Sequence, residues 1–386
     1  MDEHEHHHAE SQRPPLTLVI AAAIMLIALG VIGRSNAPSI QAQTNPNEET
    51  VEARVITVLD EGVTDQGGIQ QPYQKLRLEI LTGSRAGRAV DVDYGTQGFA
   101  SSSILYKADD RVQVSQIIRP DGGEIYFITE PDRLGSLITL LVLFVVVIVA
   151  VSRWKGVRSL LGMAISLYVI TQFILPMILA GRDPVLVSVL GAFGLLAVTQ
   201  YLIYGWSLKT HAAVFGILIS LIITGVLASI FVDAARLSGF GAEEVGFLQV
   251  AAGSINPRGL LLAGILIGAI GVLDDLTISQ ASAVFELSRA NRALGLRDLY
   301  RRAMNIGQDH IASTVNTLVL AYVGASLPLL LLFAIYPQPF GQIVNREFVT
   351  EEVVRTLVGS LGLVSAVPIT TLLACMLVGT PRRRNG

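Results

Sequence analysis

The sequence predicts an α-helical membrane protein with about eight transmembrane helices and a small external all-β domain, barrel-like or OB-like, between the first two helices. Three observations support this fold class. Of the 386 residues, 51% are hydrophobic and only 15% are charged, whereas soluble globular proteins carry roughly 25% charged residues. Apolar runs of roughly 20 residues, long enough to cross a bilayer core, recur after residue 134. Between residues 50 and 130, apolar residues instead alternate with polar ones, as they do in strands.

The composition argues against several classes of function. The formal net charge of −3 gives no support for nucleic-acid binding. The only cysteine, Cys375, lies in an apolar run, so one chain can build neither a disulfide nor a cysteine-based metal site. The sequence lacks the motifs of P-loop ATPases, HExxH zincins, GxSxG serine hydrolases and dinucleotide-binding proteins. We therefore expect no enzyme, no cofactor and no catalytic metal.

The chain should begin with a tail and a first transmembrane helix. Residues 1–15 are polar and predict a disordered cytoplasmic tail, although clustered histidines at positions 4 and 6–8 leave metal binding as an alternative. Residues 16–33 form an apolar run that is longer than the roughly 7–15 residues of a signal-peptide core, and no A-x-A cleavage site follows it. We therefore expect an uncleaved transmembrane helix, with a cleaved signal peptide as the alternative.

Residues 50–130 predict the external β-domain. Apolar and polar residues alternate there in short runs that Gly, Asp and Pro interrupt. About 80 residues suffice for one small independent core in a barrel or a sandwich. The expected strands cover residues 51–58, 76–80, 89–94, 111–115 and 124–128.

Residues 134–380 should form a seven-helix transmembrane domain. The expected spans are 134–152, 159–180, 185–204, 211–232, 258–282, 311–335 and 354–379. Between two of these spans, the segment 283–303 mixes arginines with apolar residues at helical spacing. This pattern predicts a cytoplasmic amphipathic segment that lies on the membrane surface.

Basic residues predict the orientation. Arginine and lysine cluster at 153–158, at 289–302 and after residue 381, and these loops fall on one side if every span is real. Because basic loops tend to stay in the cytoplasm, both termini should be cytoplasmic and the β-domain should be outside. We expect a multi-pass protein of the plasma membrane, in contact with the lipid bilayer, a proton or small cation, and a protein partner of the β-domain.

Asp274 and Asp275 are the most informative polar residues. The apolar run before them, 260–273, is too short to cross a bilayer alone, so a full span places both carboxylates inside the membrane or near its cytoplasmic face. Each buried carboxylate costs roughly 2.5–3.5 kcal/mol there, and a bound proton or small cation would offset that cost. We therefore predict that the pair binds a proton or cation. The alternative is that the span ends at Leu273 and both aspartates face cytoplasmic water.

A second group of polar residues lies at 305–317. On one face of the predicted helix are Asn305, Asp309, Ser313 and Asn316, with His310, Thr314 and Thr317 beside them. Hydroxyl groups commonly stabilise contacts between membrane helices, and this explanation covers the serine and the two threonines. Asp309 and His310 can titrate, so we expect them to relay or balance charge, while Asn316 orders the site.

Three blocks of sequence resemble the YibE/F-like family of bacterial multi-pass membrane proteins. They are GAIGVLDD at 268–275, NIGQDH at 305–310 and NTLVLAYVG at 316–324. The resemblance covers nearly the whole chain and implies the multi-pass fold, with the β-domain after the first span. It implies no particular activity. The first aspartate position varies in the family, which makes Asp275 the stronger candidate of the pair.

The chain also resembles SecD and SecF of the RND superfamily at the level of topology. In those proteins, too, one span precedes an external domain, and a proton-coupling acidic helix is followed by a cytoplasmic amphipathic segment and a polar helix. His310 would stand where those proteins carry a basic residue, although this chain has an extra helical hairpin and a smaller external domain. We therefore expect a proton- or ion-coupled transporter or membrane motor. The alternative is a non-transporting membrane scaffold whose external β-domain binds a partner.

Overall fold

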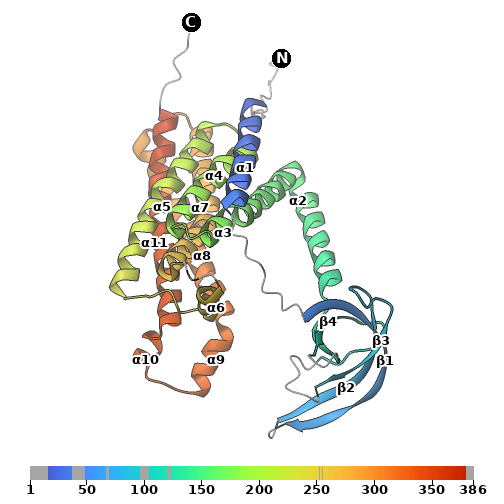
Figure 1. Ribbon diagram of the computed structural model, residues 1–386. Helices are drawn as coiled ribbons and strands as arrows, with labels where there is room; N and C mark the ends of the chain where they lie inside the picture. Colours follow the sequence, from blue (N-terminus) through green and yellow to red (C-terminus); the bar gives the residue numbers. More distant parts are fainter. Residues whose placement is uncertain are drawn as a thin grey trace. The chain divides into compact units, whose positions relative to one another are not determined.

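The computed structural model describes residues 16–36, 48–66, 69–95, 104–119, 123–251, 253 and 255–379. The chain divides into two compact units (Figure 1). One unit, Ser39–Val151, holds the strands and the first part of helix α2, and the other, Met1–Pro38 with Ser152–Gly386, holds the remaining helices. The predicted tail at 1–15 lies outside the described residues.

The β-unit is one antiparallel sheet whose strands follow the order β3-β2-β1-β4-β5. The strands are β1 (Glu48–Gln66), β2 (Ile69–Ile80), β3 (Ala89–Tyr94), β4 (Arg111–Ile118) and β5 (Glu124–Pro131). Register shifts in β1 between Val55 and Thr57 and between Val58 and Asp60 increase the local twist and bend. The sheet curls around one apolar core as a half-barrel. The prediction of a small antiparallel β-domain is therefore confirmed.

Alternation along the strands places one set of side chains in that core. Val51, Ala53 and Val55 of β1 are buried, as are Leu76 and Leu78 of β2, because side chains two residues apart share a face of a strand. A buried polar bridge adds to the core: the Gln74 side chain accepts a hydrogen bond from the Tyr106 backbone N–H at 2.7 Å and donates one to the Tyr106 carbonyl at 3.1 Å. This bridge anchors the segment before β4 to β2.

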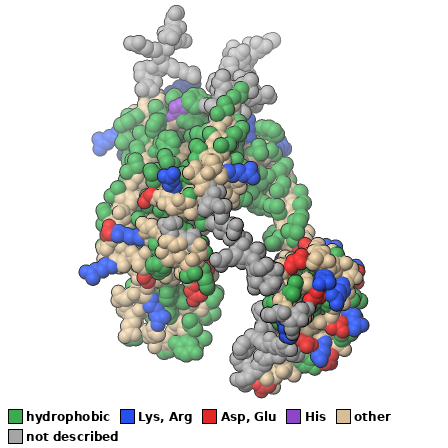
Figure 2. Space-filling model, in the orientation of Figure 1, with side chains coloured by type: hydrophobic (Ala, Val, Ile, Leu, Met, Phe, Trp, Pro, Cys, Tyr) green, Lys and Arg blue, Asp and Glu red, His purple; other side chains and the backbone are tan. Residues whose placement is uncertain are grey.

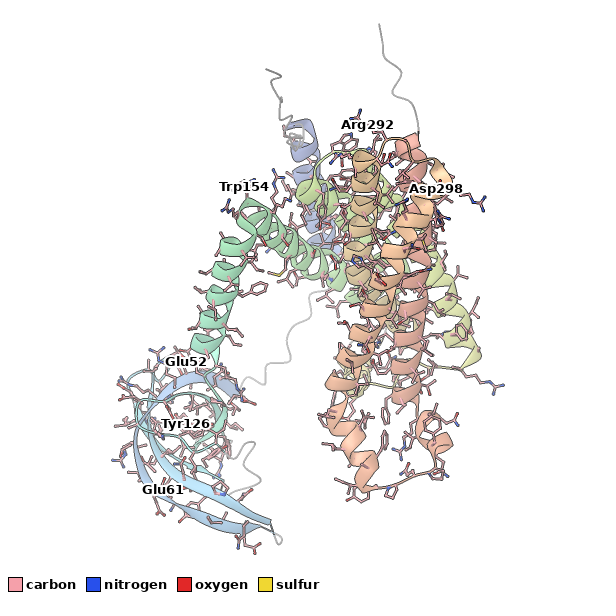
Figure 3. The ribbon with its side chains drawn as sticks, turned by 180° about the vertical axis from the view of Figure 1, so that it is seen from behind. Glu52, Glu61, Tyr126, Trp154, Arg292 and Asp298 are labelled. Carbon is pink, nitrogen blue, oxygen red and sulfur yellow. The ribbon has the colours of Figure 1, made fainter. Side chains whose placement is uncertain are left out.

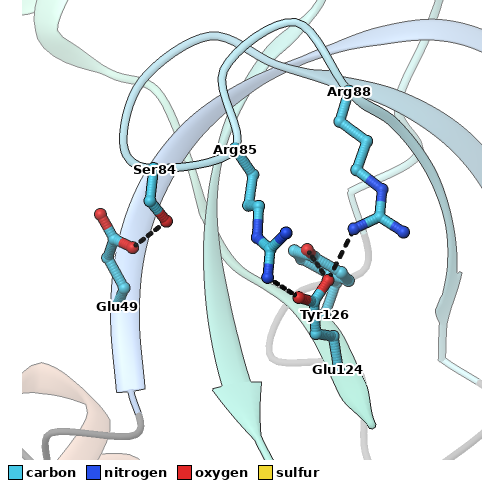
Figure 4. Close-up of polar contacts among 6 residues, drawn as sticks. All are labelled: Glu49, Ser84, Arg85, Arg88, Glu124 and Tyr126. Atoms are coloured by element: carbon cyan, nitrogen blue, oxygen red, sulfur yellow. Dashed lines mark hydrogen bonds and ion pairs between the residues drawn. The ribbon is translucent and has the colours of Figure 1, made fainter. Parts of the chain in front are cut away.

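Ion pairs join the two edge strands of the half-barrel (Figure 4). Arg85 and Arg88, in the turn between β2 and β3, both bind the carboxylate of Glu124 at the start of β5. The Arg88 contact is 2.9 Å long, and the Tyr126 hydroxyl donates to the same carboxylate at 2.9 Å. Side chains therefore connect β5 to the turn before β3, where the sheet has no backbone ladder.

The helical unit is built from long apolar helices. Among the described residues, five helical segments are long and apolar enough to cross a membrane: Leu134–Leu179, α4 (Pro184–Tyr204), α5 (Leu208–Ala234), α7 (Pro257–Ala290) and Glu347–Val378 of α11 (Glu347–Gly379). Helices α8 (Leu296–Ala325) and α9 (Leu327–Ile335) add a sixth if counted as one span, although they meet at 63°. On the face drawn in Figure 2, hydrophobic side chains cover much of these helices, whereas the β-unit surface is rich in charge. The predicted class, a largely helical membrane protein, is supported.

The segment Leu134–Leu179 is interrupted. It comprises α2 (Leu134–Val169), the π-helical turn η1 (Ile170–Ile174) and α3 (Leu175–Leu179). Its 46 residues would rise about 69 Å as one straight helix, roughly twice the thickness of a bilayer core. Arg153 breaks α2 with a non-helical φ of 49° and ψ of −131°, and Trp154 follows at the break (Figure 3).

Helix α1 (Leu16–Asn36) packs against the region of the π-helical turn. Pro176 has no N–H with which to bond the Gln172 carbonyl one turn before it. A Cβ at Gly33 would overlap that carbonyl oxygen, and one at Gly30 would overlap the Tyr168 hydroxyl. The two glycines therefore let α1 approach the interrupted helix closely.

Helices α5 and α11 run antiparallel through the centre of the unit and make a close contact at two points. A Cβ at Gly216 would overlap the Thr370 hydroxyl, and a Cβ at Gly362 would overlap the Thr224 hydroxyl. The two points lie two turns apart on each helix, so each helix presents a glycine opposite the threonine of the other. Small residues allow this close approach between membrane helices.

Segment 283–303 comprises the last part of α7, a short turn and the first part of α8. Arg292 and Asp298 mark this end of the helical unit in Figure 3. Its apolar side chains pack on protein. Val284 and Leu299 are buried in a cluster with Ala213 of α5 and Cys375 of α11. Part of the apolar side of this segment therefore packs against α5 and α11, while Leu296 is exposed.

Two short helices complete the unit. Helix α6 (Glu243–Ala251) lies between α5 and α7, and α10 (Phe340–Val344) lies between α9 and α11. The Glu347 side chain, in the first turn of α11, accepts hydrogen bonds from the Ser238 hydroxyl and from the backbone N–H of Ser238 and Gly239. These bonds hold the segment after α5 against the start of α11.

Candidate functional site

Asp274 and Asp275 lie midway along α7, and their side chains have different surroundings. The Asp274 side chain is partly buried, and its Oδ1 atom is shielded from solvent without a hydrogen-bond partner among the described residues. Asp275 is exposed on the surface of the single chain. The α7 helix continues for 15 further residues beyond Asp275, so both carboxylates are placed well inside the helix and not at its end.

A set of buried polar side chains, here called the polar layer, lies one helical turn beyond residues of the central apolar cluster on α4, α7 and α11. The apolar cluster at the centre of the unit includes Leu196 of α4, Leu273 of α7 and Ala366 of α11. One helical turn beyond each of these lie Gln200, Thr277 and Thr370, all fully buried. Asp274 follows Leu273 directly. The three helices run in the same direction. Pro184 at the start of α4 lies against Gly259 at the start of α7. Residues of α11 meet α7 in the same order along both helices, with Val367 near Leu276 and Thr371 near Gln280.

Most hydrogen-bonding capacity in this layer is unused by the protein. Both amide atoms of Gln200 and the hydroxyl of Thr370 are buried without a hydrogen-bond partner in the part of the chain that the structure describes. Thr277 is satisfied within its own helix, since its hydroxyl donates to the Leu273 carbonyl at 2.8 Å. Buried polar groups are usually paired with protein or water. The unpaired amide and hydroxyl groups of this layer are therefore available to bind water, a proton or an ion.

Gln280 connects three helices one turn further along α7. Its fully buried amide donates to the Ala303 carbonyl of α8 at 2.9 Å and to the Thr371 hydroxyl of α11 at 2.7 Å. Gly307 of α8 makes the approach possible, because a Cβ there would lie 3.0 Å from the Gln280 amide atoms and would overlap Val367. This junction fixes α7, α8 and α11 beside the two aspartates.

The polar residues of α8 share a face, but that face points away from the rest of the chain. Its apolar side, with Met304, Ile311 and Val315, packs on α7 and α11. The candidate residues exposed on the outer side are Asn305, Asp309, His310, Ser313, Asn316 and Thr317. The structure therefore keeps these six side chains out of the polar layer and away from the shielded Asp274 oxygen.

Sequence reasoning missed Gln200, Gln280, Thr370 and Thr371. These uncharged polar residues occur inside apolar runs, either next to another polar residue, as in Thr199–Gln200 and Thr370–Thr371, or among the polar residues that follow Asp275, as in Gln280. Their position was itself a signal, because an amide in an apolar span requires a partner across a helix contact. Among the described residues, no three His, Cys, Asp or Glu side chains come together to hold a metal ion.

Comparison with known proteins places the chain in a family. The family model described as YibE/F-like protein matches residues 140–380, which is more than half of the chain and includes the whole candidate site. No curated protein and no solved structure gives a significant match.

Proposed function

The chain belongs to the YibE/F-like family, and we propose that it is a proton- or ion-coupled membrane transporter or membrane motor with Asp274 as the coupling carboxylate. The observation that carries this proposal is the shielded Asp274 oxygen, which has no hydrogen-bond partner among the described residues. The buried amide of Gln200 on α4 and the buried hydroxyl of Thr370 on α11, likewise unpaired there, support it. A charged carboxylate inside a bilayer costs roughly 2.5–3.5 kcal/mol. A bound proton or cation removes that cost, so occupancy of the site would be linked to the packing of α4, α7 and α11.

Asp275 and the outer face of α8 have supporting roles in this proposal. Asp275, adjacent and exposed, would exchange the proton or cation with the surroundings. Asp309 and His310 would relay or balance charge on the outer face of α8, with the hydroxyl and amide groups of that face solvating them. Lipid cannot satisfy such groups, so the proposal requires water or protein against this face.

The proposed membrane topology has eight spans in the plasma membrane and both termini in the cytoplasm. The break at Arg153 divides Leu134–Leu179 into two spans, and the bent pair α8–α9 counts as one. Helix α1, a largely apolar helix of 21 residues, is the eighth. In this arrangement the basic segments around Arg153 and Arg292 lie in the cytoplasm, and the β-unit is outside.

The transport proposal is tested in proteoliposomes with paired variants. Wild-type protein should carry protons or small cations under an imposed membrane potential, reported by an internal pH-sensitive dye. Asp274→Asn should abolish this flux while the protein stays folded, because the amide keeps the volume but cannot bind a proton. Asp298→Asn is the matched control, since Asp298 is exposed and paired only with Arg301. Wild-type flux no greater than that of protein-free vesicles, or full flux in Asp274→Asn, would disprove the proposal.

The melting temperature of the same variants separates coupling from a structural role. Removal of an unpaired buried carboxylate should leave stability unchanged or raised. If Asp274 instead anchored a structural pair, its replacement would lower stability by about 3–5 kcal/mol.

A second candidate function is a scaffold whose β-unit binds a protein. Ile56, Leu59 and Val63 of β1 are 45%, 45% and 66% exposed, an unusual run of apolar side chains on a charged domain. Replacing all three with Ser should leave flux intact and abolish capture of a partner if this second function holds.

A further inference from the structure

A cavity in the helical unit lies among α9, α10 and the start of α11, which Figure 1 shows at the end opposite to the C-terminus of α11. It is enclosed by the last turns of α8, by α9 and α10, by the first turns of α11 and by the segment after α5. Its volume is about 560 Å³, within the roughly 300–1,000 Å³ of sites that bind small organic molecules. The bend between α8 and α9 opens the space, because a straight helix would run past α11 without enclosing it.

Aromatic rings form much of the wall. Those that line the cavity are Tyr322, Phe333, Phe340 and Phe348. Phe333 and Phe348 stack with their centroids 6.3 Å apart. The guanidinium carbon of Arg346 lies 5.8 Å from the centre of the Phe333 ring, so this wall already accommodates a cation against an aromatic ring.

The charged groups in the lining leave one carboxylate in excess. Glu352 and Arg355 pair at 3.6 Å, which balances one negative charge with one positive charge. Glu351 is 6% exposed and, among the described residues, has no cation within ion-pair distance. Its one hydrogen bond there is from the Gly241 N–H at 3.0 Å. Just outside the lining, Glu347 and Arg346 carry opposite charges, and Glu347 also accepts three hydrogen bonds from residues 238–239. The excess of one carboxylate therefore remains.

We propose that this cavity binds lipophilic cations, organic molecules with an apolar or aromatic body and a single positive charge. The apolar wall would accept the apolar body of a cation or of an anion alike, but the charge of the site discriminates between the two. A cation is attracted by Glu351 and by the faces of the aromatic rings, whereas an anion of equal size meets a buried carboxylate. The proposal does not depend on transport, since it concerns binding in the absence of any gradient.

The test uses two probes of nearly equal size and opposite charge, tetraphenylphosphonium and tetraphenylborate. Titration calorimetry on the purified full-length protein in a neutral detergent gives the affinity for each. We expect the cation to bind at least tenfold more tightly than the anion and to raise the melting temperature. Equal affinities, a preference for the anion or no binding of either probe would overturn the proposal.

Variants locate the binding. Glu351→Gln keeps the bond from Gly241 but removes the charge, so it should reduce the preference for the cation to near unity. Glu286→Gln is the control, because Glu286 is an exposed carboxylate at the far end of α7. Asp274→Asn should also leave cation binding unchanged, which separates this site from the proposed transport site. A full preference retained in Glu351→Gln would place the binding elsewhere and refute the assignment.

Discussion

Replacement of Gly216 with Ala should loosen the contact between α5 and α11, and replacement of Thr370 with Ala in the same protein should restore it. The new methyl group would overlap the Thr370 hydroxyl and lie 3.1 Å from its Cβ. Both helices are held by further contacts along their length, so the strain must be absorbed locally. Overpacking of this kind costs about 1–3 kcal/mol.

The Thr370→Ala change alone should cost little, within about 1 kcal/mol. The Thr370 hydroxyl is buried without a partner, so its removal breaks no hydrogen bond and relieves the cost of an unsatisfied group. In the double variant the overlap with the hydroxyl is gone, and only the 3.1 Å approach to the Cβ of residue 370 remains, which a shift of a few tenths of an ångström relieves. We therefore expect a favourable coupling energy of about 1–3 kcal/mol between the two positions.

Equilibrium unfolding of the four proteins in detergent micelles measures this coupling. The second contact, Gly362 with Thr224, provides an internal comparison, because the Thr224 hydroxyl donates to the Ser220 carbonyl at 2.8 Å. Thr224→Ala loses that bond, so rescue of Gly362→Ala should be less complete. Additive effects at Gly216 and Thr370 would show that the two residues do not touch in the folded protein, and the packing argument would fail.

Further predictions concern the β-unit and the topology. Residues 48–131 expressed alone should give a sheet-type circular dichroism spectrum and melt cooperatively, and a helical spectrum would refute the assignment. Burial, with a smaller contribution from a neighbouring tyrosine, raises the pKa of Tyr106 to about 12. The folded state thus keeps this proton when the unfolded state has lost it, so stability should fall from about pH 10 to 12 by up to about 2–3 kcal/mol. Tyr106→Phe should flatten that fall in an alkaline melting series. Gln74→Leu should destabilise the unit by about 2–3 kcal/mol in urea, because it leaves a buried N–H unpaired, and a neutral result would contradict the role of the bridge. A reporter fused after Pro131 should lie outside the cytoplasm, and one fused after Ser207 should lie inside it. The reverse pattern would show that the proposed topology is inverted.

The strands could be predicted where they face the core. Strand β3 matches the predicted range 89–94, and β4 and β5 begin at the predicted residues. Strand β1 is longer than the predicted 51–58, because its second half forms a hairpin arm with β2 in which the β1 side chains on both faces are largely exposed. Alternation is enforced only where one face is buried, so a period-two pattern cannot reveal such an arm.

The polar face of α8 could be predicted as a face, but its direction could not. Helical spacing correctly groups Asn305, Asp309, Ser313 and Asn316. The direction of the polar face is set by the opposite side of α8, because Gly307 and Ile311 on that side fit against α7 and α11. Spacing within one helix carries no information on the shape of the next, and for the same reason it could not identify the hydrogen bonds of Gln280.

The contact of α1 with the π-helical turn has a consequence for the order in which the protein is made. Gly30 and Gly33 leave the ribosome early, but the hydroxyl of Tyr168 and the carbonyl of Gln172 that they contact come much later. The whole β-unit is synthesised in between. During that interval α1 lacks its final neighbour, and its glycine-bearing side stays uncovered. The helix that begins the chain is therefore packed into place only after the second part of α2 has emerged.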